Sequence, residues 1–93
     1  MTRVYAADAL KDRIVVVTGG GRGIGSGISR VVAHAGGEVV IIYPTNEEKI
    51  HADKVIAEIT ASGGKASAYR CDIGIQSECE TVIAQIIKDK GRI

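Results

Sequence analysis

Hydrophobic residues in this chain fall into short continuous runs separated by stretches with helical spacing. The first run, residues 13–18, reads Arg-Ile-Val-Val-Val-Thr with almost no polar alternation, as in a strand buried on both faces. Residues 38–43 form a similar run, which Pro44 ends because proline has no N–H to give to a strand ladder. Residues 66–71 begin a third strand-plus-helix unit. We therefore predict three strands, the first of them buried on both faces.

Apolar residues after each run recur with the period of an α-helix, which predicts three helices with one apolar face each. The predicted faces are Ile24, Ile28, Val31, Val32 and Ala35 in the first helix, Ala52, Val55, Ile56 and Ile59 in the second, and Cys79, Val82, Ile83, Ile86 and Ile87 in the third. Thr45 and Glu48 have the spacing of a capping box at the start of the second helix. Glycines at 36–37, 63–64 and 91 end the helices by tolerating positive φ angles.

The alternation of strands and helices predicts a parallel sheet whose strands are joined by crossover helices. The fold class is therefore α/β, with helices on one or both faces of the sheet. A chain of 93 residues suffices for one domain and not for two. Residues 1–11 show no sustained period, and we expect them to form an N-terminal leader.

Composition and charge exclude several classes of protein. Hydrophobic residues make up 45% of the chain and charged residues 25%, as in an ordinary globular protein. The apolar runs are far shorter than the roughly 20 residues of a membrane helix, so no membrane partner is expected. Twelve Lys and Arg against 11 Asp and Glu leave a net charge of +1 without a basic cluster, which argues against a nucleic-acid partner.

Targeting and metal signals are equally sparse. Asp8 and Lys11 interrupt the apolar stretch that a secretory signal would need, so we expect a cytoplasmic protein. Cys71 and Cys79 have no second cysteine pair to complete a zinc site, and we predict that both are core thiols and that the chain holds no metal.

A glycine-rich turn, Thr-Gly-Gly-Gly-Arg-Gly-Ile-Gly at 18–25, joins the first predicted strand to the first predicted helix. Glycines there let a phosphate approach the N–H groups at the helix N-terminus. The turn lacks the Gly-Lys-Ser/Thr of a P-loop, and Ser26 stands where the fingerprint G-x-G-x-x-G needs its third glycine. Because a buried strand precedes the turn and an amphipathic helix follows it, we predict a nucleotide-phosphate site rather than a loop without a ligand.

The spacing Thr-Gly-x-x-x-Gly-x-Gly in this turn resembles the cofactor motif of the short-chain dehydrogenase/reductase family. Four further segments look like segments of that family and occur in the same order along the chain: 15–18, 63–66, 71–73 and 91–93. The resemblance therefore covers about residues 11–93. It is closest to fungal-type reductases of polyols, ketoses or hydroxynaphthalenes. The resemblance implies the N-terminal βαβαβα half of a Rossmann-type doubly wound parallel sheet. Residues 12–93 would then be a partial dinucleotide-binding domain that ends before the fourth strand.

The resemblance also implies roles for individual residues. Gly19, Gly23 and Gly25 would shape the pyrophosphate turn, with the backbone of Ile24 facing the phosphates. Asp72 would hold the adenine amino group, with Ile73 beside the ring. Independently of the family, Asp72 ends the third predicted strand, and ligands of open α/β sheets bind beyond such ends. A carboxylate near the N-terminus of the third helix is an equally good account of Asp72.

The end of the second predicted strand bears on the choice between NAD and NADP. An NAD site places an acidic residue there to bond the ribose 2′-hydroxyl, whereas this chain has Tyr43, followed by Pro44, Thr45 and Asn46. Arg22 stands where NADP-dependent members of the family carry a basic residue, and its guanidinium suits a phosphate. We therefore expect NADP. The full set of expected cofactor-binding residues is Gly19, Gly21, Arg22, Gly23, Ile24, Gly25, Tyr43, Thr45, Asn46, Asp72 and Ile73.

The catalytic elements of the family are not found within these residues. No tyrosine has a lysine four positions later, and Asn46 is the single asparagine, so no catalytic residue is assigned. The prediction is the NADP(H)-binding portion of a short-chain reductase, inactive alone, that transfers hydride between nicotinamide and a carbonyl or alcohol. The alternatives are a non-enzymatic nucleotide-binding module and a truncated fragment. We expect the chain to bind nicotinamide dinucleotide and to self-associate or pair with a missing C-terminal half.

Overall fold

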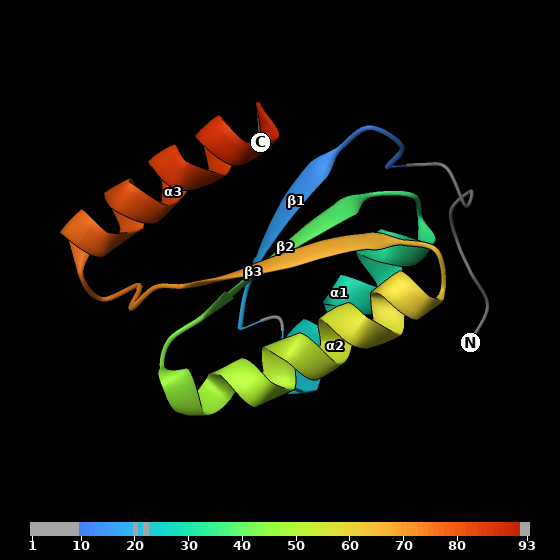
Figure 1. Cartoon of the computed structure of the whole chain (residues 1–93), viewed down its shortest axis with the longest axis horizontal. Helices are drawn as coiled ribbons and strands as arrows, with labels where there is room; N and C mark the ends of the chain where they lie inside the picture. The colour runs from blue at the N-terminus through green and yellow to red at the C-terminus, as the bar shows by residue number, and fades with distance from the viewer. Residues whose placement is uncertain (1–9, 20, 22, 92–93) are drawn as a thin grey trace.

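The computed structural model describes residues 10–19, 21 and 23–91 (Figure 1). Its elements are β1 (Ile14–Thr18), α1 (Gly23–His34), β2 (Glu38–Tyr43), the 3₁₀ turn η1 (Asn46–Glu48), α2 (Lys49–Ala61), β3 (Lys65–Arg70) and α3 (Gln76–Lys90). All three predicted strands and all three predicted helices are present in the predicted order. The α/β fold class and the βαβαβα half-fold are confirmed.

The three strands form one parallel sheet in the order β1-β2-β3. Val16 of β1 lies opposite Val40 of β2, and Val40 lies opposite Ser67 of β3. Among the described strands, β1 therefore pairs along one edge only. Because all strands run in the same direction, their carboxyl ends meet at one edge of the sheet.

The central strand β2 is buried on both faces, as its apolar run predicts. Val39 and Ile41 point to one face and Val40 and Ile42 to the other, and none is more than 4% exposed. Figure 1 shows α1 and α2 covering one face of the sheet and α3 lying on the opposite face. The first core cluster is Val17, Val32, Val39, Ile41, Ala52, Val55 and Ile59, and the second is Ile14, Val40, Ile42, Cys71 and Ile86.

The predicted apolar face of α1 is wrong in part. Val32 is buried, but Ile24, Ile28 and Val31 are exposed. Ser26 and Ser29 are buried in their place, because each hydroxyl donates to a backbone carbonyl within the helix, which satisfies its polar group without water. Two small side chains therefore face the sheet, and the larger apolar stripe of α1 points to a side that no described element covers.

The predicted capping box at the second helix does not form as expected. The Thr45 side chain makes no capping hydrogen bond, and the 3₁₀ turn η1 lies between it and α2. The backbone closes this turn instead, with the Glu48 N–H donating to the Thr45 carbonyl at 3.1 Å. The predicted glycine ends are confirmed, with φ angles of +91° at Gly36, +88° at Gly63 and +83° at Gly91.

Most of the predicted leader, residues 1–9, lies outside the described residues. Leu10 belongs to the fold, since it packs against the first core cluster and its N–H donates to the Ala35 carbonyl at 2.8 Å.

Within the described ranges, no helix is long and apolar enough to cross a membrane.

Helix α3 packs on the sheet through apolar side chains, with Cys79 and Val82 partly buried against the second core cluster, and through polar contacts near its C-terminus. Ile86 is fully buried in the second core cluster. The Tyr69 hydroxyl donates to Asp89 Oδ2 at 2.6 Å, and Lys90 Nζ lies 2.7 Å from Glu38 Oε2. The bond to Asp89 raises the pKa of Tyr69 to about 12 and lowers the pKa of Asp89 below its ordinary value of 3.8.

We expect the bond between Tyr69 and Asp89 to stabilise the fold over a wide, bounded pH range. The contribution of Asp89 is present above its unfolded pKa of 3.8 and is lost as the pH falls through its lower folded pKa. The contribution of Tyr69 is complete below pH 10 and is lost as the pH rises through about 12. The free energy of unfolding of wild type should therefore exceed that of Tyr69→Phe between these limits, measured by denaturant titration.

The matched control is the same substitution in an Asp89→Asn background, where the hydroxyl has lost its carboxylate partner. There the loss at acid pH should vanish and the loss at alkaline pH should begin at lower pH, because burial and Glu38 still raise the pKa of Tyr69 without the bond to Asp89. A Tyr69→Phe effect that is the same at every pH in both backgrounds would contradict the assignment.

Candidate cofactor-binding site

Backbone hydrogen bonds hold the carboxyl ends of the three strands together. The Gly19 N–H donates to the Ile42 carbonyl at 2.8 Å, and the Cys71 N–H donates to the Tyr43 carbonyl at 2.9 Å. Both bonds continue the strand ladders beyond the last residues of β1 and β3. The glycine turn, the chain after β2 and the loop after β3 therefore leave the sheet at one edge.

The glycine turn connects this edge to the N-terminus of α1. Gly19 and Gly23 have φ angles of +67° and +52°, in the left-handed region where glycine is favoured. Helix α1 begins at Gly23, and the first four N–H groups of a helix have no partner within it. These groups carry the positive end of the helix dipole, so the N-terminus of α1 is suited to a phosphate group.

Gly21 has a packing role that the sequence pattern did not reveal. A Cβ atom at this position would lie 2.8 Å from the Ala52 nitrogen and 2.9 Å from the Ala52 Cα. Both atoms belong to the backbone of α2, which cannot move aside as a flexible side chain can. The turn therefore rests directly on α2, and only glycine fits this contact.

A cleft of about 270 Å³ lies at the carboxyl edge of the sheet. Its lining comes from all three strand ends: Thr18, Gly19, Ile42, Pro44, Cys71 and Ile73. Ile73 is 62% exposed, so a large apolar side chain stands beside an open, mainly apolar cleft. Such a surface suits a flat ring, because contact with the ring would remove both apolar surfaces from water.

Asp72 organises the loop between β3 and α3. Its Oδ1 accepts a hydrogen bond from the Gly74 N–H at 2.9 Å, and its carbonyl accepts one from the Ile75 N–H at 3.0 Å. The Asp72 N–H donates to Glu78 Oε1 in the first turn of α3 at 3.2 Å. The side chain is exposed at the edge that carries the cleft, so it is accessible to a ligand while fixing the turn.

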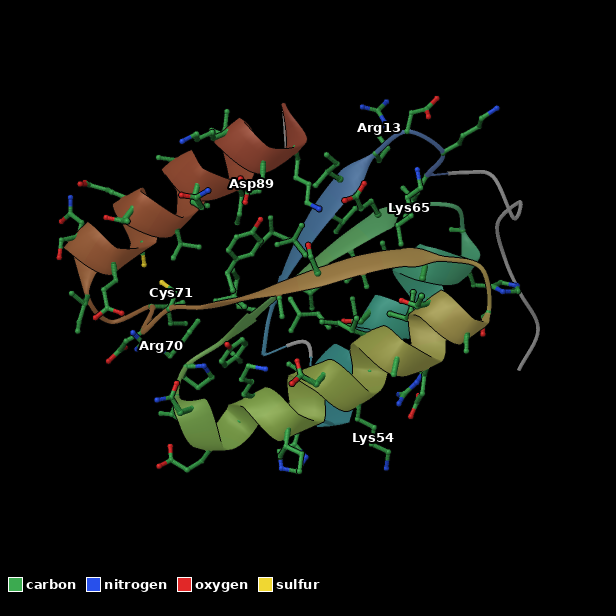
Figure 2. The ribbon with its side chains drawn as sticks, viewed as in Figure 1. Arg13, Lys54, Lys65, Arg70, Cys71 and Asp89 are labelled. Atoms are coloured by element: carbon green, nitrogen blue, oxygen red, sulfur yellow. The ribbon has the colours of Figure 1, made fainter. Side chains whose placement is uncertain are left out.

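A larger hollow of about 850 Å³ lies at the opposite edge of the sheet. Its lining includes Arg13, Gly37 and Lys65, which lie where the three strands begin. Figure 2 shows Arg13 and Lys65 at that end of the sheet. The C-terminal ends of α1 and α2 also line it, and helix C-termini carry partial negative charge. The residues that line this hollow include no helix N-terminus, so the smaller cleft, which lies beside the glycine turn and the start of α1, is the better candidate for a nucleotide.

The structure brings most of the expected cofactor-binding residues to this one edge. They are Gly19, Gly21, Gly23, Ile24, Gly25, Tyr43, Thr45, Asn46, Asp72 and Ile73. Arg22 lies outside the described residues, so its contact with a phosphate stays a prediction. The Ile24 side chain is 84% exposed at the start of α1.

Sequence reasoning missed four residues that line the cleft: Thr18, Ile42, Pro44 and Cys71. The sequence could have identified them, because each stands within one residue of the end of a predicted strand. The carboxyl ends of parallel strands lie at the same edge of a sheet. Arg70 was also missed. It is exposed at the end of β3, directly opposite Tyr43 in the register, and Figure 2 shows it where β3 leads into the loop before α3.

Comparison with known proteins agrees with this geometry. Residues 13–93 match the family model described as short chain dehydrogenase. The chain belongs to this family. The short chain dehydrogenase/reductase nsrJ of Aspergillus novofumigatus is 41% identical over 93 residues, which are all of this chain and 34% of that protein.

Two further relatives carry NADP in their names. The NADP-dependent mannitol dehydrogenase of Alternaria alternata is 34% identical over 88 residues, or 91% of this chain and 32% of that protein. A solved metagenomic short-chain oxidoreductase in complex with NADP matches with a TM-score of 0.81 and 31% identity, over 90% of this chain and 37% of its own. The chain thus spans about a third of the length of these relatives.

We predict that Gly21→Ala destabilises the protein by about 1–3 kcal/mol, because the added methyl group must displace the backbone of α2. The free energy of unfolding, measured by urea titration, reports this change.

Gly27→Ala is the matched control, since it adds the same methyl group to α1 where nothing lies within 4 Å. It should stabilise the chain by about 0.5–1 kcal/mol through helix propensity. Equal effects of the two substitutions would show that the turn does not rest on α2.

Proposed function

We propose that this chain is the NADP(H)-binding portion of a short-chain reductase and holds the adenosine and pyrophosphate end of the cofactor. The observation that carries the proposal is the placement of the glycine turn, the N-terminus of α1 and the cleft of Pro44 and Ile73 at one sheet edge. The reaction of the whole enzyme would be hydride transfer between the nicotinamide of NADP(H) and a carbonyl or alcohol carbon.

Each part of the edge has a role in this proposal. The N–H groups of Gly23, Ile24 and Gly25 bind the pyrophosphate, Gly19 lets it approach the backbone, and Gly21 lets the turn rest on α2. Ile73 packs against the adenine ring, and the exposed Asp72 carboxylate accepts a hydrogen bond from the adenine amino group. The Gly74 N–H already holds the Asp72 side chain in position at 2.9 Å.

Three features favour NADP over NAD. The end of β2 presents Tyr43 rather than a carboxylate, so no fixed negative charge there repels a 2′-phosphate. Thr45 and Asn46 follow it with neutral hydrogen-bonding side chains, and both are exposed. Arg22 in the turn and Arg70 at the end of β3 supply positive charge.

Arg22→Ala should weaken NADP binding about tenfold or more, because a charge-assisted hydrogen bond contributes roughly 1.5–3 kcal/mol. NAD lacks the 2′-phosphate, so its affinity should stay near that of wild type. Calorimetric titration with both nucleotides at fixed salt measures the two effects.

Lys54→Ala is the control for this substitution, since it removes the same unit of charge from an exposed position on α2 that points away from the sheet (Figure 2). It should leave both affinities unchanged. Wild type that binds NAD as tightly as NADP, or an Arg22→Ala loss common to both, would overturn the role of Arg22.

Tyr43→Asp should shift the preference between the two nucleotides toward NAD. A carboxylate at the end of β2 would repel the 2′-phosphate and would offer the ribose 2′-hydroxyl of NAD an acceptor. We expect the ratio of NADP to NAD affinity to fall about tenfold or more by the same titration. Tyr43→Phe keeps the ring without the charge and should leave the ratio unchanged. A Tyr43→Asp variant with the same ratio of NADP to NAD affinity as wild type would place the 2′-phosphate elsewhere.

The same proposal includes a partner at the outer edge of β1. This strand pairs with β2 only among the described strands, and Ile24, Ile28 and Val31 of α1 are exposed. Unpaired N–H and C=O groups on an apolar edge favour the addition of a further strand. We propose that a second copy of the chain, or a C-terminal half of the reductase, covers this edge.

Sedimentation at high micromolar concentration should therefore detect self-association of the isolated chain. Val16→Lys places a charge on the edge strand and should shift the chain toward monomer. A strictly monomeric wild type whose β1 amides are fully protected from hydrogen exchange would contradict this expectation.

A further inference from the structure

Cys71 and Cys79 bring two thiols together where the sheet meets α3. Cys71 directly follows β3, and Cys79 lies in the first turn of α3. Their sulfur atoms are 3.8 Å apart, with the Cys71 thiol donating to Cys79 Sγ. Figure 2 shows the sulfur of Cys71 pointing toward α3. The spacing in the chain alone does not require this contact, because eight positions separate the residues.

The two thiols differ in access. Cys71 is 3% exposed in the second core cluster, whereas Cys79 is only partly buried. Burial raises the pKa of the Cys71 thiol, and its hydrogen bond to Cys79 adds to this effect. An oxidant would therefore meet Cys79 first, while Cys71 stays protonated and protected until its partner has reacted.

We propose that Cys71 and Cys79 form a reversible intramolecular disulfide that ties the N-terminus of α3 to the end of β3. The sulfur atoms need to approach from 3.8 Å to about 2.0 Å, and Cys79 is only partly buried. This proposal does not depend on the cofactor or on the reductase activity.

The oxidant is a low-molecular-weight disulfide such as oxidised glutathione. Cys79 attacks one of its sulfur atoms and expels one glutathione thiolate, which leaves a mixed disulfide on Cys79. Cys71 then attacks the Cys79 sulfur and expels the second glutathione. In total, the two protein thiols lose two electrons and two protons, and glutathione disulfide gains them to become two thiols.

The bridge would also alter the loop that lines the cleft. In the reduced chain, the Cys79 thiol donates to the Ile73 carbonyl at 3.5 Å. A disulfide removes both S–H donors, so this carbonyl loses its contact with Cys79. Asp72 and Ile73 lie between the two cysteines in the chain. Oxidation of the pair would therefore change the contacts of the loop that carries these two residues.

The test is equilibration of the wild-type chain in anaerobic mixtures of reduced and oxidised glutathione near neutral pH. Acid quenching, alkylation with N-ethylmaleimide and intact mass measurement then count the remaining thiols. We expect conversion from a doubly alkylated chain to an unalkylated monomer about 2 Da lighter than the reduced chain. The midpoint should not depend on protein concentration, and dithiothreitol should restore both thiols.

The fold should promote the bridge. We expect half-oxidation in native buffer at a mixture about tenfold more reducing than in denaturant, since the folded chain holds the sulfur atoms in contact. Cys71→Ala should yield only a glutathione adduct at Cys79, and Cys79→Ala should keep its buried Cys71 as a free thiol. The wild-type measurement needs neither variant to fold. Accumulation of glutathione adducts or covalent dimers in place of the unalkylated monomer, or a bridge that forms more readily in denaturant, would overturn the proposal.

Discussion

Burial of β2 on both faces is the constraint on which the rest of this structure depends. A strand with Val39 and Ile41 on one face and Val40 and Ile42 on the other needs apolar cover on both. Helices α1 and α2 supply it on one side, and α3 supplies it on the other through Ile86. A helix connects each strand to the next and returns the chain to the edge of the sheet where the previous strand began. The strands are therefore parallel, and all of their carboxyl ends lie at one edge.

That shared edge also brings together the segments of the proposed cofactor site. Each strand ends in a different kind of segment: a glycine turn after β1, a neutral polar segment after β2 and an Asp-containing loop after β3. Backbone bonds from Gly19 to Ile42 and from Cys71 to Tyr43 fix their relative positions. The larger hollow at the opposite edge has more volume, but the residues that line it include no helix N-terminus for a phosphate.

The elements of this fold follow from the sequence because the pattern of each is local. The apolar runs identify the strands to within one residue, and the glycines at 36, 63 and 91 fix the helix ends. The face of α1 could not be predicted, because Ser26 and Ser29 satisfy their hydroxyls inside the helix and so occupy core positions. The approach of Gly21 to α2 and the contact of Cys71 with Cys79 are tertiary contacts, which no local pattern encodes.

The most direct test of the account is to map nucleotide binding on the backbone amides of the chain by NMR titration with NADP. We expect the largest chemical-shift changes in the glycine turn and the start of α1, at Tyr43, Thr45 and Asn46 around the end of β2, and at Asp72 and Ile73. The amides of Arg13, Gly37 and Lys65 at the opposite edge should change little. Shifts concentrated around Arg13 and Lys65, with the glycine turn unaffected, would contradict the placement of the cofactor at the carboxyl edge of the sheet.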